Sequence, residues 1–404
     1  MIKRTLQELC LNITDGKHGD CENEENSGYY FISCKDIFDG QINYKNARQI
    51  TKADFEETHK RTMLEVDDIL LTNSGTIGRM AFVTDREATT KTTFQKSVAI
   101  IKPDKQKVLP RYLYYQLQNC VPQFINSSNG SAQKNLLLST MRTFQIEIEE
   151  NREKQEKIAN TLSAYDDLIE NNQKQIKLLE EAAQRLYKEW FVDLRFPEHE
   201  NTKIVDGVPE GWKKNCAEKF FEITIGKTPP RTEKRCFTTG KNGIPWVSIA
   251  DMENSGMFVL NTAENLTDDA IKQYNVKVIP KNAVLLSFKL TVGRVAIAPN
   301  DICTNEAIAH FKGRRECERE YTYFYLKNFH YDELGSTSSI SKAVNSKIIK
   351  AMPFIMPSEK LLKEYSSKTK DIFDLIICKQ KMDNNLKIAR DRILHKLMSG
   401  EVEV

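Results

Sequence analysis

Apolar side chains between residues 151 and 192 recur at alternating steps of four and three residues. This spacing keeps them on one face of a helix and is typical of a helix that packs along a partner helix. The pattern predicts one long helix over 151–192. Its single polar seam member, Asn172, is of the kind that fixes the register of such helix pairs. The seam consists of Ile158, Leu162, Tyr165, Ile169, Asn172, Ile176, Leu179, Ala183, Leu186 and Trp190.

A second, less regular apolar stripe lies in residues 358–404. We expect this segment to form the partner helix, antiparallel to the first, so that the two make a coiled-coil pair. The alternative is that the two helices are unrelated and that each folds onto its own neighbouring domain. The members of the stripe are Ile372, Ile376, Met382, Leu386, Ala389, Ile393 and Leu397.

Outside these helices the apolar positions come in short runs. Residues 68–72, 80–84 and 98–102 are rich in apolar and β-branched side chains and are separated by Gly, Asn and Ser, as short strands joined by turns would be. Residues 110–119 and 320–328 are aromatic-rich and long enough for helices. The globular parts are therefore expected to be α/β or α+β domains.

These runs occur twice along the chain. The order of the matching blocks is kept while their separation drifts between 207 and 215 residues, as it would if loops had gained and lost residues. The pattern predicts a duplicated domain, each copy followed by a helix, and a pseudo-two-fold internal repeat. The matched blocks are 13–17 with 223–227, 31–37 with 246–252, 69–79 with 284–294, 112–117 with 321–326, Lys134 with Lys342, and Ile169 with Ile376. The predicted boundaries are a first globular domain at 1–150, a central helix at 151–192, a linker at 193–206, a second globular domain at 207–357 and a distal helix at 358–404.

Composition narrows the class of protein only slightly. The chain has 404 residues, of which 40% are hydrophobic and 28% charged, as expected for two or three globular domains. No apolar run approaches the ~20 residues of a membrane helix, and the nine cysteines include no Cys-x-x-Cys pair, so we expect a cytoplasmic protein with reduced cysteines.

The net charge of +3 is unevenly distributed. Residues 1–150 hold 19 basic against 20 acidic side chains, whereas residues 201–357 hold 22 against 17. Neither block is basic enough to bind DNA by charge alone, so any binding would use local patches on nearly neutral domains.

Motifs of catalysis are missing from the sequence. It contains no G-x-x-x-x-G-K-[S/T] phosphate loop and no Asn-Pro-Pro-aromatic motif of adenine methyltransferases. The six histidines stand alone, without metal-ligand spacing, and no metal site is expected. Two carboxylate pairs, Asp67-Asp68 and Asp268-Asp269, lie beside turns, and we interpret both as solvated loop charge.

Two segments near the end of the first long helix resemble a known family. They read WFVDLRFP at residues 190–197 and, after a short polar stretch, GVPEGW at residues 207–212. With these segments in place, the chain resembles the specificity subunit of type I restriction–modification enzymes over nearly its whole length, as domain, helix, domain, helix.

This resemblance implies a protein without a catalytic site, in which each recognition domain reads one half of a split double-stranded DNA sequence and the helix pair sets the gap between the halves. It also implies that the helices dock two adenine methyltransferase subunits, which restriction subunits with motor and nuclease activity join. S-adenosylmethionine, ATP and Mg²⁺ would then belong to these partners, and no cofactor to this chain. Two alternatives stay open: a protein-binding coiled-coil scaffold, and a divergent nuclease or methyltransferase.

Candidate DNA contacts lie in turn segments that recur in both halves and carry hydrogen-bond donors. Arg or Lys can bind guanine bidentately and Asn or Gln adenine, while glycine turns with cations suit phosphate contact. The simpler interpretation is that these segments are solvated hairpin turns. The candidates in the first half are Lys17, His18, Ser33, Lys35, Asn73, Ser74, Thr76, Arg79, Gln95, Lys96, Gln133 and Lys134. Those in the second half are Lys227, Thr228, Arg231, Ser248, Lys289, Thr291, Arg294, Ser338 and Lys342.

Overall fold

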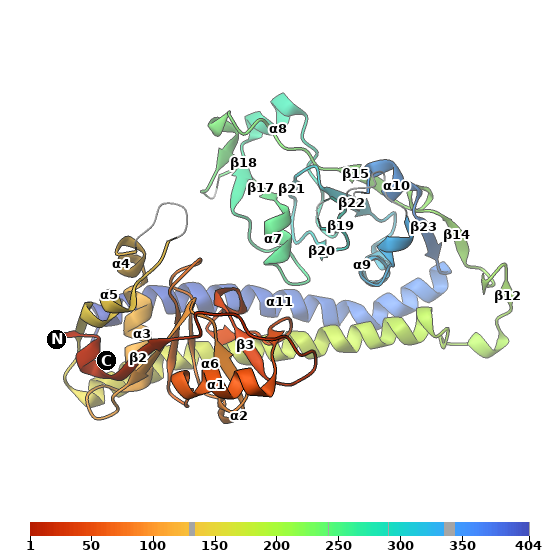
Figure 1. The fold of residues 1–404 in the computed structure, drawn as a ribbon. Helices are drawn as coiled ribbons and strands as arrows, with labels where there is room; N and C mark the ends of the chain where they lie inside the picture. The colour runs from red at the N-terminus through yellow and green to blue at the C-terminus, as the bar shows by residue number, and fades with distance from the viewer. Residues whose placement is uncertain (129–133, 241, 290, 335–343, 404) are drawn as a thin grey trace. The chain divides into compact units, whose positions relative to one another are not determined.

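The structure of the chain is a computed structural model, whose fold is drawn in Figure 1. It divides into two compact units, which are treated separately below. Unit 1 comprises residues 1–168 and 387–404, and unit 2 comprises residues 169–386. The described residues are 1–128, 134–240, 242–289, 291–334 and 344–403.

Unit 1 is built around a four-stranded antiparallel sheet with the strand order β2-β10-β7-β8. Every residue of β7 is buried, which explains why this strand reads as a continuous apolar run in the sequence. The strands of this main sheet are β2 (Cys10–Asp15), β7 (Ile69–Thr72), β8 (Met80–Phe82) and β10 (Val98–Pro103).

Shorter elements surround the main sheet of unit 1. Strand β3 pairs antiparallel with β6 and parallel with β9, while β1 pairs with β11 and β4 with β5. These strands are β1 (Ile2–Thr5), β3 (Tyr30–Ile32), β4 (Ile37–Phe38), β5 (Gln41–Ile42), β6 (Arg48–Gln49), β9 (Thr92–Phe94) and β11 (Gln145–Ile148). The helices are α1 (Lys52–Thr62), α2 (Arg86–Thr89), α3 (Pro110–Asn119), α4 (Val121–Asn126) and α5 (Leu138–Thr143).

Unit 2 repeats this plan. Its main sheet has the order β15-β22-β19-β20 and is again antiparallel throughout. Its second sheet has the order β16-β18-β17-β21, in which β17 and β21 are parallel, as β3 and β9 are in unit 1. The strands are β12 (Ile204–Val205), β13 (Val208–Pro209), β14 (Lys213–Cys216), β15 (Glu222–Ile225), β16 (Phe237–Thr238), β17 (Ile244–Val247), β18 (Glu264–Leu266), β19 (Val284–Ser287), β20 (Val295–Ile297), β21 (Cys303–Thr304), β22 (Ile308–Lys312) and β23 (Pro353–Met356). The helices are α7 (Ile249–Glu253), α8 (Asp268–Tyr274), α9 (Arg319–Lys327) and α10 (Ser346–Ala351).

The repeat extends to the ends of individual helices. Helices α1 and α8 each follow a threonine, Thr51 or Thr267, whose hydroxyl accepts a hydrogen bond from the first turn of the helix. Both helices end at a residue with a left-handed backbone, Met63 or Asn275. The duplicated mixed α/β fold predicted from the sequence is confirmed.

The two predicted long helices are present, and a part of each belongs to each unit. In unit 1, Ile158 and Leu162 of the first helix share one buried cluster with Leu394 and Leu397 of the second. In unit 2, the ring centroid of Trp190 lies 5.9 Å from that of Tyr365. The helices are α6 (Arg152–Tyr187), which continues as a π-helix over Lys188–Val192, and α11 (Glu359–Met398).

Polar contacts also join α6 to α11. In unit 1, Asp166 Oδ1 accepts a hydrogen bond from Arg390 Nη1 at 2.7 Å, and Asp166 Oδ2 accepts one from Tyr115 OH at 2.6 Å. In unit 2, Asn172 Oδ1 accepts a hydrogen bond from Lys379 Nζ at 3.4 Å. Because the partner's residue number falls along α11 as the number rises along α6, the helices are antiparallel within each unit. The alternative of two unrelated helices is therefore wrong.

The predicted seam of α6 is buried or half-buried throughout, and Asn172 is 5% exposed. The stripe predicted for α11 is wrong at Met382, which is 46% exposed, whereas its neighbour Asp383 is buried. Polar residues such as Asp383 and Thr369 occupy the buried face of α11, so counting apolar residues alone misplaces that face. The other predicted members are buried or half-buried: Ile372, Ile376, Leu386, Ala389, Ile393 and Leu397.

The interpretation of the Asp67-Asp68 pair as solvated loop charge is wrong for Asp68. Its buried carboxylate accepts hydrogen bonds from Lys102 Nζ at 2.7 Å and from Glu65 N at 2.8 Å. Burial raises the pKa of Asp68 to about 6. Asp268 and Asp269 are exposed in the first turn of α8, where the helix dipole favours acidic side chains.

None of the helices in the described part of the chain is long and apolar enough to cross a membrane. All nine cysteines are free thiols, and most are buried or half-buried. Among the described residues, no group of three or more His, Cys, Asp or Glu side chains is arranged to hold a metal ion.

Candidate nucleic-acid interface

Several segments of unit 1 with predicted DNA contacts meet at one end of the main sheet. Lys17, which follows β2, accepts a hydrogen bond on its carbonyl from Lys96 N at 3.0 Å. Asn73, which follows β7, donates its N–H to Ser97 O at 3.1 Å and accepts one from Leu136 N at 2.7 Å. The segments near residues 17, 73, 96 and 136, which are far apart in the sequence, therefore form one surface.

A glycine in each unit permits this close approach. A Cβ atom at Gly16 would lie 1.9 Å from Phe94 O, and one at Gly226 would lie 2.1 Å from Asn305 O. Any side chain there would force the two backbones apart. The glycine turns predicted in both halves are thus required by backbone packing at the edge of the interface.

The converging segments of unit 1 form a cleft of ≈ 670 Å³, which we call the first cleft. Four of the predicted contacts line it, namely His18, Asn73, Ser74 and Lys96. The other lining residues were not predicted, and they are Asp15, Arg61, Asn135, Leu136, Leu137, Leu138 and Ser139.

A buried carboxylate in the first cleft binds two of its neighbours. Asp15 accepts a hydrogen bond from Arg61 Nη2 at 2.5 Å on Oδ1, and its Oδ2 lies 2.9 Å from His18 Nε2. The side chain of Asp15 is only 7% exposed, against 49% for Arg61. Arg61 lies 46 residues after Asp15, in the last turn of α1, so no local sequence pattern could have linked them.

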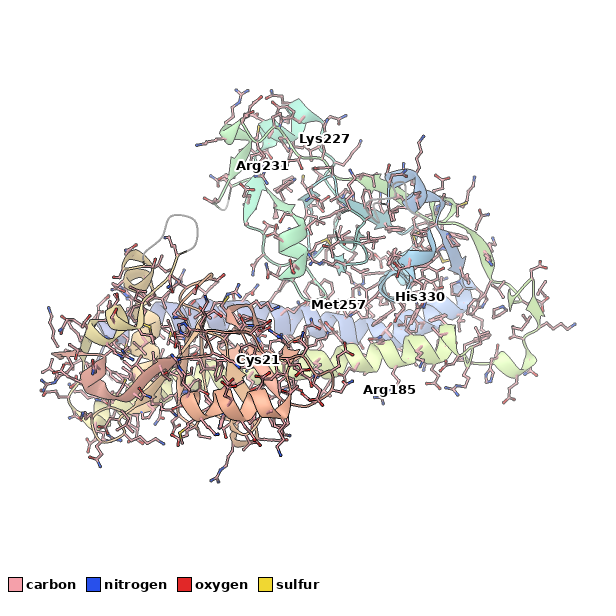
Figure 2. All side chains as sticks on the ribbon, viewed as in Figure 1. Cys21, Arg185, Lys227, Arg231, Met257 and His330 are labelled. Carbon is pink, nitrogen blue, oxygen red and sulfur yellow. The ribbon has the colours of Figure 1, made fainter. Side chains whose placement is uncertain are left out.

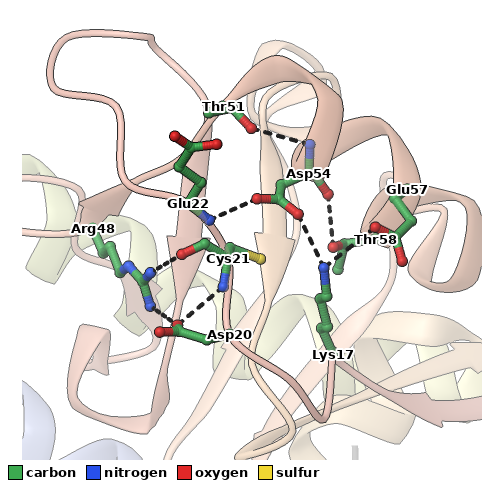
Figure 3. Close-up of polar contacts among 9 residues, drawn as sticks. All are labelled: Lys17, Asp20, Cys21, Glu22, Arg48, Thr51, Asp54, Glu57 and Thr58. Atoms are coloured by element: carbon green, nitrogen blue, oxygen red, sulfur yellow. Dashed lines mark hydrogen bonds and ion pairs between the residues drawn. The ribbon is translucent and has the colours of Figure 1, made fainter.

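Lys17 is held within unit 1 by carboxylates of α1 (Figure 3). Its Nζ donates to Asp54 Oδ1 at 3.0 Å and to Glu57 Oε2 at 3.3 Å. The hydrogen bond to Asp54 raises the pKa of Lys17. Asp54 also accepts a hydrogen bond from Glu22 N at 2.6 Å, which together with Lys17 lowers the pKa of its carboxyl. Lys17 thus fastens α1 to the loop after β2, and a phosphate would have to compete with two carboxylates for it.

Ser33 and Ser248 make identical local contacts in the two units. Ser33 donates to Asp36 Oδ2 through its backbone N at 2.9 Å and through its Oγ at 2.7 Å. Ser248 donates to Asp251 Oδ2 in the same way, at 2.8 Å and 2.7 Å. These capping boxes give both serines a structural partner. Lys35, two residues after Ser33, is exposed.

The turns after β7 and β19 are also built alike. Thr72 Oγ1 donates to Thr76 O at 2.5 Å and accepts from the backbone N–H of the residue that follows the turn at 2.9 Å. Ser287 Oγ donates to Thr291 O at 2.6 Å and accepts the equivalent N–H at 3.0 Å. The side chains of Thr76 and Thr291 are left exposed.

The arginines that end these turns reach corresponding backbone carbonyls. Arg79 Nη1 donates to Cys34 O at 3.5 Å, and Arg294 Nη1 donates to Ile249 O at 3.1 Å. Arg294 Nη2 also pairs with Glu253 Oε1 at 3.0 Å, and only 26% of its side chain is exposed. Arg294 is therefore fixed in place, whereas the exposed Arg79 is held by one long contact.

In unit 2 the loop after β15 carries Lys227 and Arg231, which Figure 2 labels in the same part of the unit. Lys227 Nζ donates to Tyr274 O, at the end of α8, at 2.6 Å. The hydroxyl of Thr228 donates to Glu306, and this hydrogen bond lowers the pKa of the Glu306 carboxyl. Lys227, like Lys17 in unit 1, fastens a helix to the loop after the edge strand.

Arg231 lies against two aromatic rings that are themselves in edge-to-face contact. Its guanidinium carbon lies 4.2 Å from the ring centroid of Phe237 and 4.7 Å from that of Trp246, in cation–π geometry. Its Nη1 pairs with Glu264 Oε2 at 2.6 Å, while 52% of the side chain stays exposed. Arg231 lines a cleft of ≈ 410 Å³, the second cleft, whose other lining residues are Lys234, Phe237, Thr238, Thr239 and Glu264.

The remaining predicted contacts are scattered or not described. Gln95 is half-buried beside the first cleft, Lys134 is exposed, and Lys289 is exposed with its Nζ 5.7 Å from the ring centroid of Phe288. Three predicted residues lie outside the described part of the chain, and they are Gln133, Ser338 and Lys342.

Comparison with known proteins adds independent findings. The family model described as "Type I restriction modification DNA specificity domain" matches the chain twice, over residues 3–181 and 209–386. The chain is 28% identical over 392 residues to the type I restriction enzyme MjaIX specificity subunit of Methanocaldococcus jannaschii. This match covers 93% of this chain and 87% of that protein. It is 24% identical over 370 residues to the type I restriction enzyme HindI specificity subunit of Haemophilus influenzae, covering 75% of this chain and 80% of that one. In fold it is similar to the crystal structure of the type I restriction-modification system S subunit from M. genitalium, with a TM-score of 0.57 at 15% identity over 98% of this chain and 95% of that one.

Proposed function

This chain belongs to the family of type I restriction-modification DNA specificity domains, and we propose that units 1 and 2 each bind one half of a split DNA sequence. The specificity subunit is the non-catalytic component of such an enzyme, and this chain carries two target-recognition domains. One observation supports the proposal most: the same sheets and loops occur twice, but the polar groups at the loop ends differ. Two domains with one framework and different donors and acceptors are suited to two different base sequences.

Two kinds of contact are needed for such binding. Exposed cations at the loop ends, such as Lys96 and Lys134 in unit 1 and Lys289 in unit 2, are suited to phosphates. Phosphate contacts orient a protein on DNA but carry no sequence information, whereas donors and acceptors within the clefts are suited to base edges. We therefore assign affinity mainly to the exposed lysines and discrimination to the polar residues that line the two clefts.

We assign the spacing of the two half-sites to helices α6 and α11. The 36 residues of α6 extend over about 54 Å, which exceeds the ~34 Å of one turn of DNA. The same helices are assigned the docking of two methyltransferase subunits, with restriction subunits joining that assembly. S-adenosylmethionine, ATP and Mg²⁺ would be bound by these partner subunits.

The proposal is tested by co-expressing the full chain with the methyltransferase subunit of its own system and mapping modified adenines in the host genome. We expect the modified adenines to lie in a single sequence with two specified parts and an unspecified gap of fixed length between them. An uninterrupted recognition sequence, or the same methylation in cells that lack this chain, would contradict the proposal.

The spacing role of the helices has a separate test. Four residues inserted into each helix at facing positions, after Asn172 in α6 and after Lys379 in α11, add about 6 Å to the pair, which is close to two base pairs of DNA. We expect the gap to lengthen by about two base pairs, with both specified parts unchanged. A four-residue insertion in the exposed linker after Glu200 is the control and should leave the gap as it is. An unchanged gap after the paired helix insertion would contradict the spacing role.

A further inference from the structure

Arg61 is presented to the first cleft by α1 and anchored by a residue of the main sheet. Its Nη2 donates to Asp15 Oδ1 at 2.5 Å, and Asp15 is the last residue of β2. Because the Asp15 side chain is only 7% exposed and sits on a paired strand, the carboxylate is a fixed anchor. It holds the half-exposed guanidinium of Arg61 in one orientation at the cleft.

The guanidinium of Arg61 keeps most of its hydrogen-bonding capacity. It has five N–H donors in one plane, of which the contact with Asp15 uses one. A pair of parallel N–H groups matches the N7 and O6 acceptors that guanine presents in the major groove. Anchoring by Asp15 reduces the conformational entropy that the side chain would lose on binding.

The charge beside Arg61 favours a base edge over a phosphate. Asp15 offsets the positive charge of the guanidinium and would repel a phosphate that approached Arg61. The N7 and O6 atoms of guanine are uncharged acceptors, so they meet no such repulsion. The exposed Lys96, which lines the same cleft, is the better phosphate ligand.

The repeat in unit 2 lacks this pair. The strand register aligns Asp15 with Ile225, because each is the end of the edge strand paired to an alanine of its neighbour. Arg61 aligns with Gln273, since each lies two residues before the left-handed residue that ends its helix. The pair is therefore an addition to the shared framework and not a part of it.

A second polar residue of the first cleft is also unique to unit 1. Asn73 is 4% exposed, and its buried carboxamide oxygen has no hydrogen-bond partner in the described part of the chain. The corresponding residue in unit 2 is the buried Phe288. A buried acceptor without a partner destabilises a free protein, so its presence where the repeat has a phenylalanine points to a cleft shaped for a ligand.

We propose that Arg61 reads a guanine in the half-site bound by unit 1 and that Asp15 is its positioning residue. The inference rests on the proposed function, in which unit 1 is a DNA reader, and adds to it the residue and the base. Arg61 was not among the predicted DNA contacts, because it lies in α1 and not in one of the recurring turn segments.

The test uses the full chain co-expressed with the methyltransferase subunit of its system, with modified adenines mapped for each variant. In Arg61→Ala we expect the preference for G at one position of one half-site to fall about 10- to 100-fold, while the other half-site and the gap stay as they are. Arg61→Lys is expected to lose most of the same preference, because an ammonium group on a flexible stem has no planar fork of donors that Asp15 can hold facing N7 and O6. Asp15→Asn is expected to lower the preference at that same position by a smaller factor.

The matched control is Gln273→Ala at the corresponding position of unit 2, which should leave that G·C position unchanged. Methylation that falls equally at all sites in Arg61→Ala and recovers in Arg61→Lys would show a phosphate contact and overturn the inference. An unchanged methylated target sequence in both variants would also overturn it. If Arg61→Ala does not yield folded protein, Arg61→Lys decides, because it keeps a cation beside Asp15. If the unaltered chain directs no methylation to a split sequence, the proposed function itself fails, which is distinguishable from a failure of Arg61 alone.

Discussion

Units 1 and 2 share a framework and differ in the polar groups that the framework presents. Ser33 and Ser248 each bind an aspartate three residues later, and the turns after β7 and β19 are closed by the same pair of hydroxyl contacts. The first cleft, by contrast, contains the ion pair of Asp15 and Arg61, whereas unit 2 has Ile225 in place of Asp15.

The difference separates two kinds of residue that look alike in a sequence. Positions whose contacts are the same in both units, such as Ser33 and Ser248, maintain the framework. Positions whose contacts differ, such as Arg61 and Arg231, are the better candidates for reading DNA. The following predictions test this separation, beginning with the largest expected effect.

Substitution of a framework glycine is expected to have a large effect in either unit. Gly16→Ala and Gly226→Ala each place a methyl group within about 2 Å of a backbone carbonyl oxygen, so the free energy of unfolding of the affected unit should fall by about 3 kcal/mol or more. Urea unfolding monitored by hydrogen exchange measures this loss unit by unit. Gly19→Ala is the matched control, since its nearest neighbour would be a flexible lysine carbon at 3.8 Å. Variants as stable as this control would refute the framework role.

Acidification is expected to weaken unit 2 through His310. Both ring nitrogens of this buried residue contact threonine hydroxyls, Thr224 at 2.9 Å and Thr304 at 2.6 Å, and burial lowers the pKa of His310 to about 3. The unfolded chain takes up this proton near pH 6.5, so stability that is present above that pH is lost as the pH falls toward 3. The loss in unfolding free energy should be about 2 kcal/mol at pH 5. Urea unfolding of wild type and His310→Gln at pH 7 and pH 5 measures it, and equal pH dependence in both would contradict the prediction.

Unit 1 is expected to respond in the opposite direction through Asp68. Burial raises the pKa of Asp68 to about 6 in the folded chain, above its value of about 3.9 when unfolded. The stability it contributes is therefore present at low pH and lost as the pH rises through 6, which corresponds to a gain of about 1 kcal/mol between pH 7 and pH 5. Hydrogen exchange of the main-sheet amides in unit 1 measures the gain. It should disappear in Asp68→Asn, and a gain that persists in this variant would assign it to another group.

The smallest effects on DNA discrimination are expected at Arg79 and Arg294, the arginines that end the turns after β7 and β19, because both also donate hydrogen bonds to backbone carbonyls. Arg79→Ala should weaken discrimination at one base position in one half-site by about 1 kcal/mol, the low end for a base contact, because its guanidinium is exposed and held by one long hydrogen bond. Arg294→Ala should change discrimination less, because Ile249 and Glu253 already fix that side chain. Methylation of oligonucleotides with single-base changes by the assembled complex measures both. An equal loss on every sequence would indicate a phosphate contact instead.

The features predictable from the sequence are those that depend on local periodicity or on comparing the chain with itself. The aromatic-rich segments 110–119 and 320–328 are the helices α3 and α9 to within one residue, and the seam of α6 is buried along its length. The buried face of α11 was placed less well, because Thr369 and Asp383 are polar members of it and apolar spacing passes over them.

The set of residues that line the first cleft could not be predicted in the same way. Asp15 and Arg61 belong to a strand and a helix 46 residues apart, so only the fold brings them together. Lys17 was predicted as a DNA contact from its glycine turn, but its carboxylate partners lie on α1, and its availability to DNA depends on them. The sequence around a cation in a turn does not show whether its side chain is bound by a distant carboxylate or is free to bind DNA.

The central claim is that the two units read different sequences independently, each with its own polar groups on a common framework. The most direct measurement is to replace residues 1–150 with the corresponding region of another specificity subunit, co-express the chimera with its methyltransferase subunit and map modified adenines. We predict that one specified part of the target changes while the other part and the gap are kept. A target that changes in both parts, or in neither, would contradict the account.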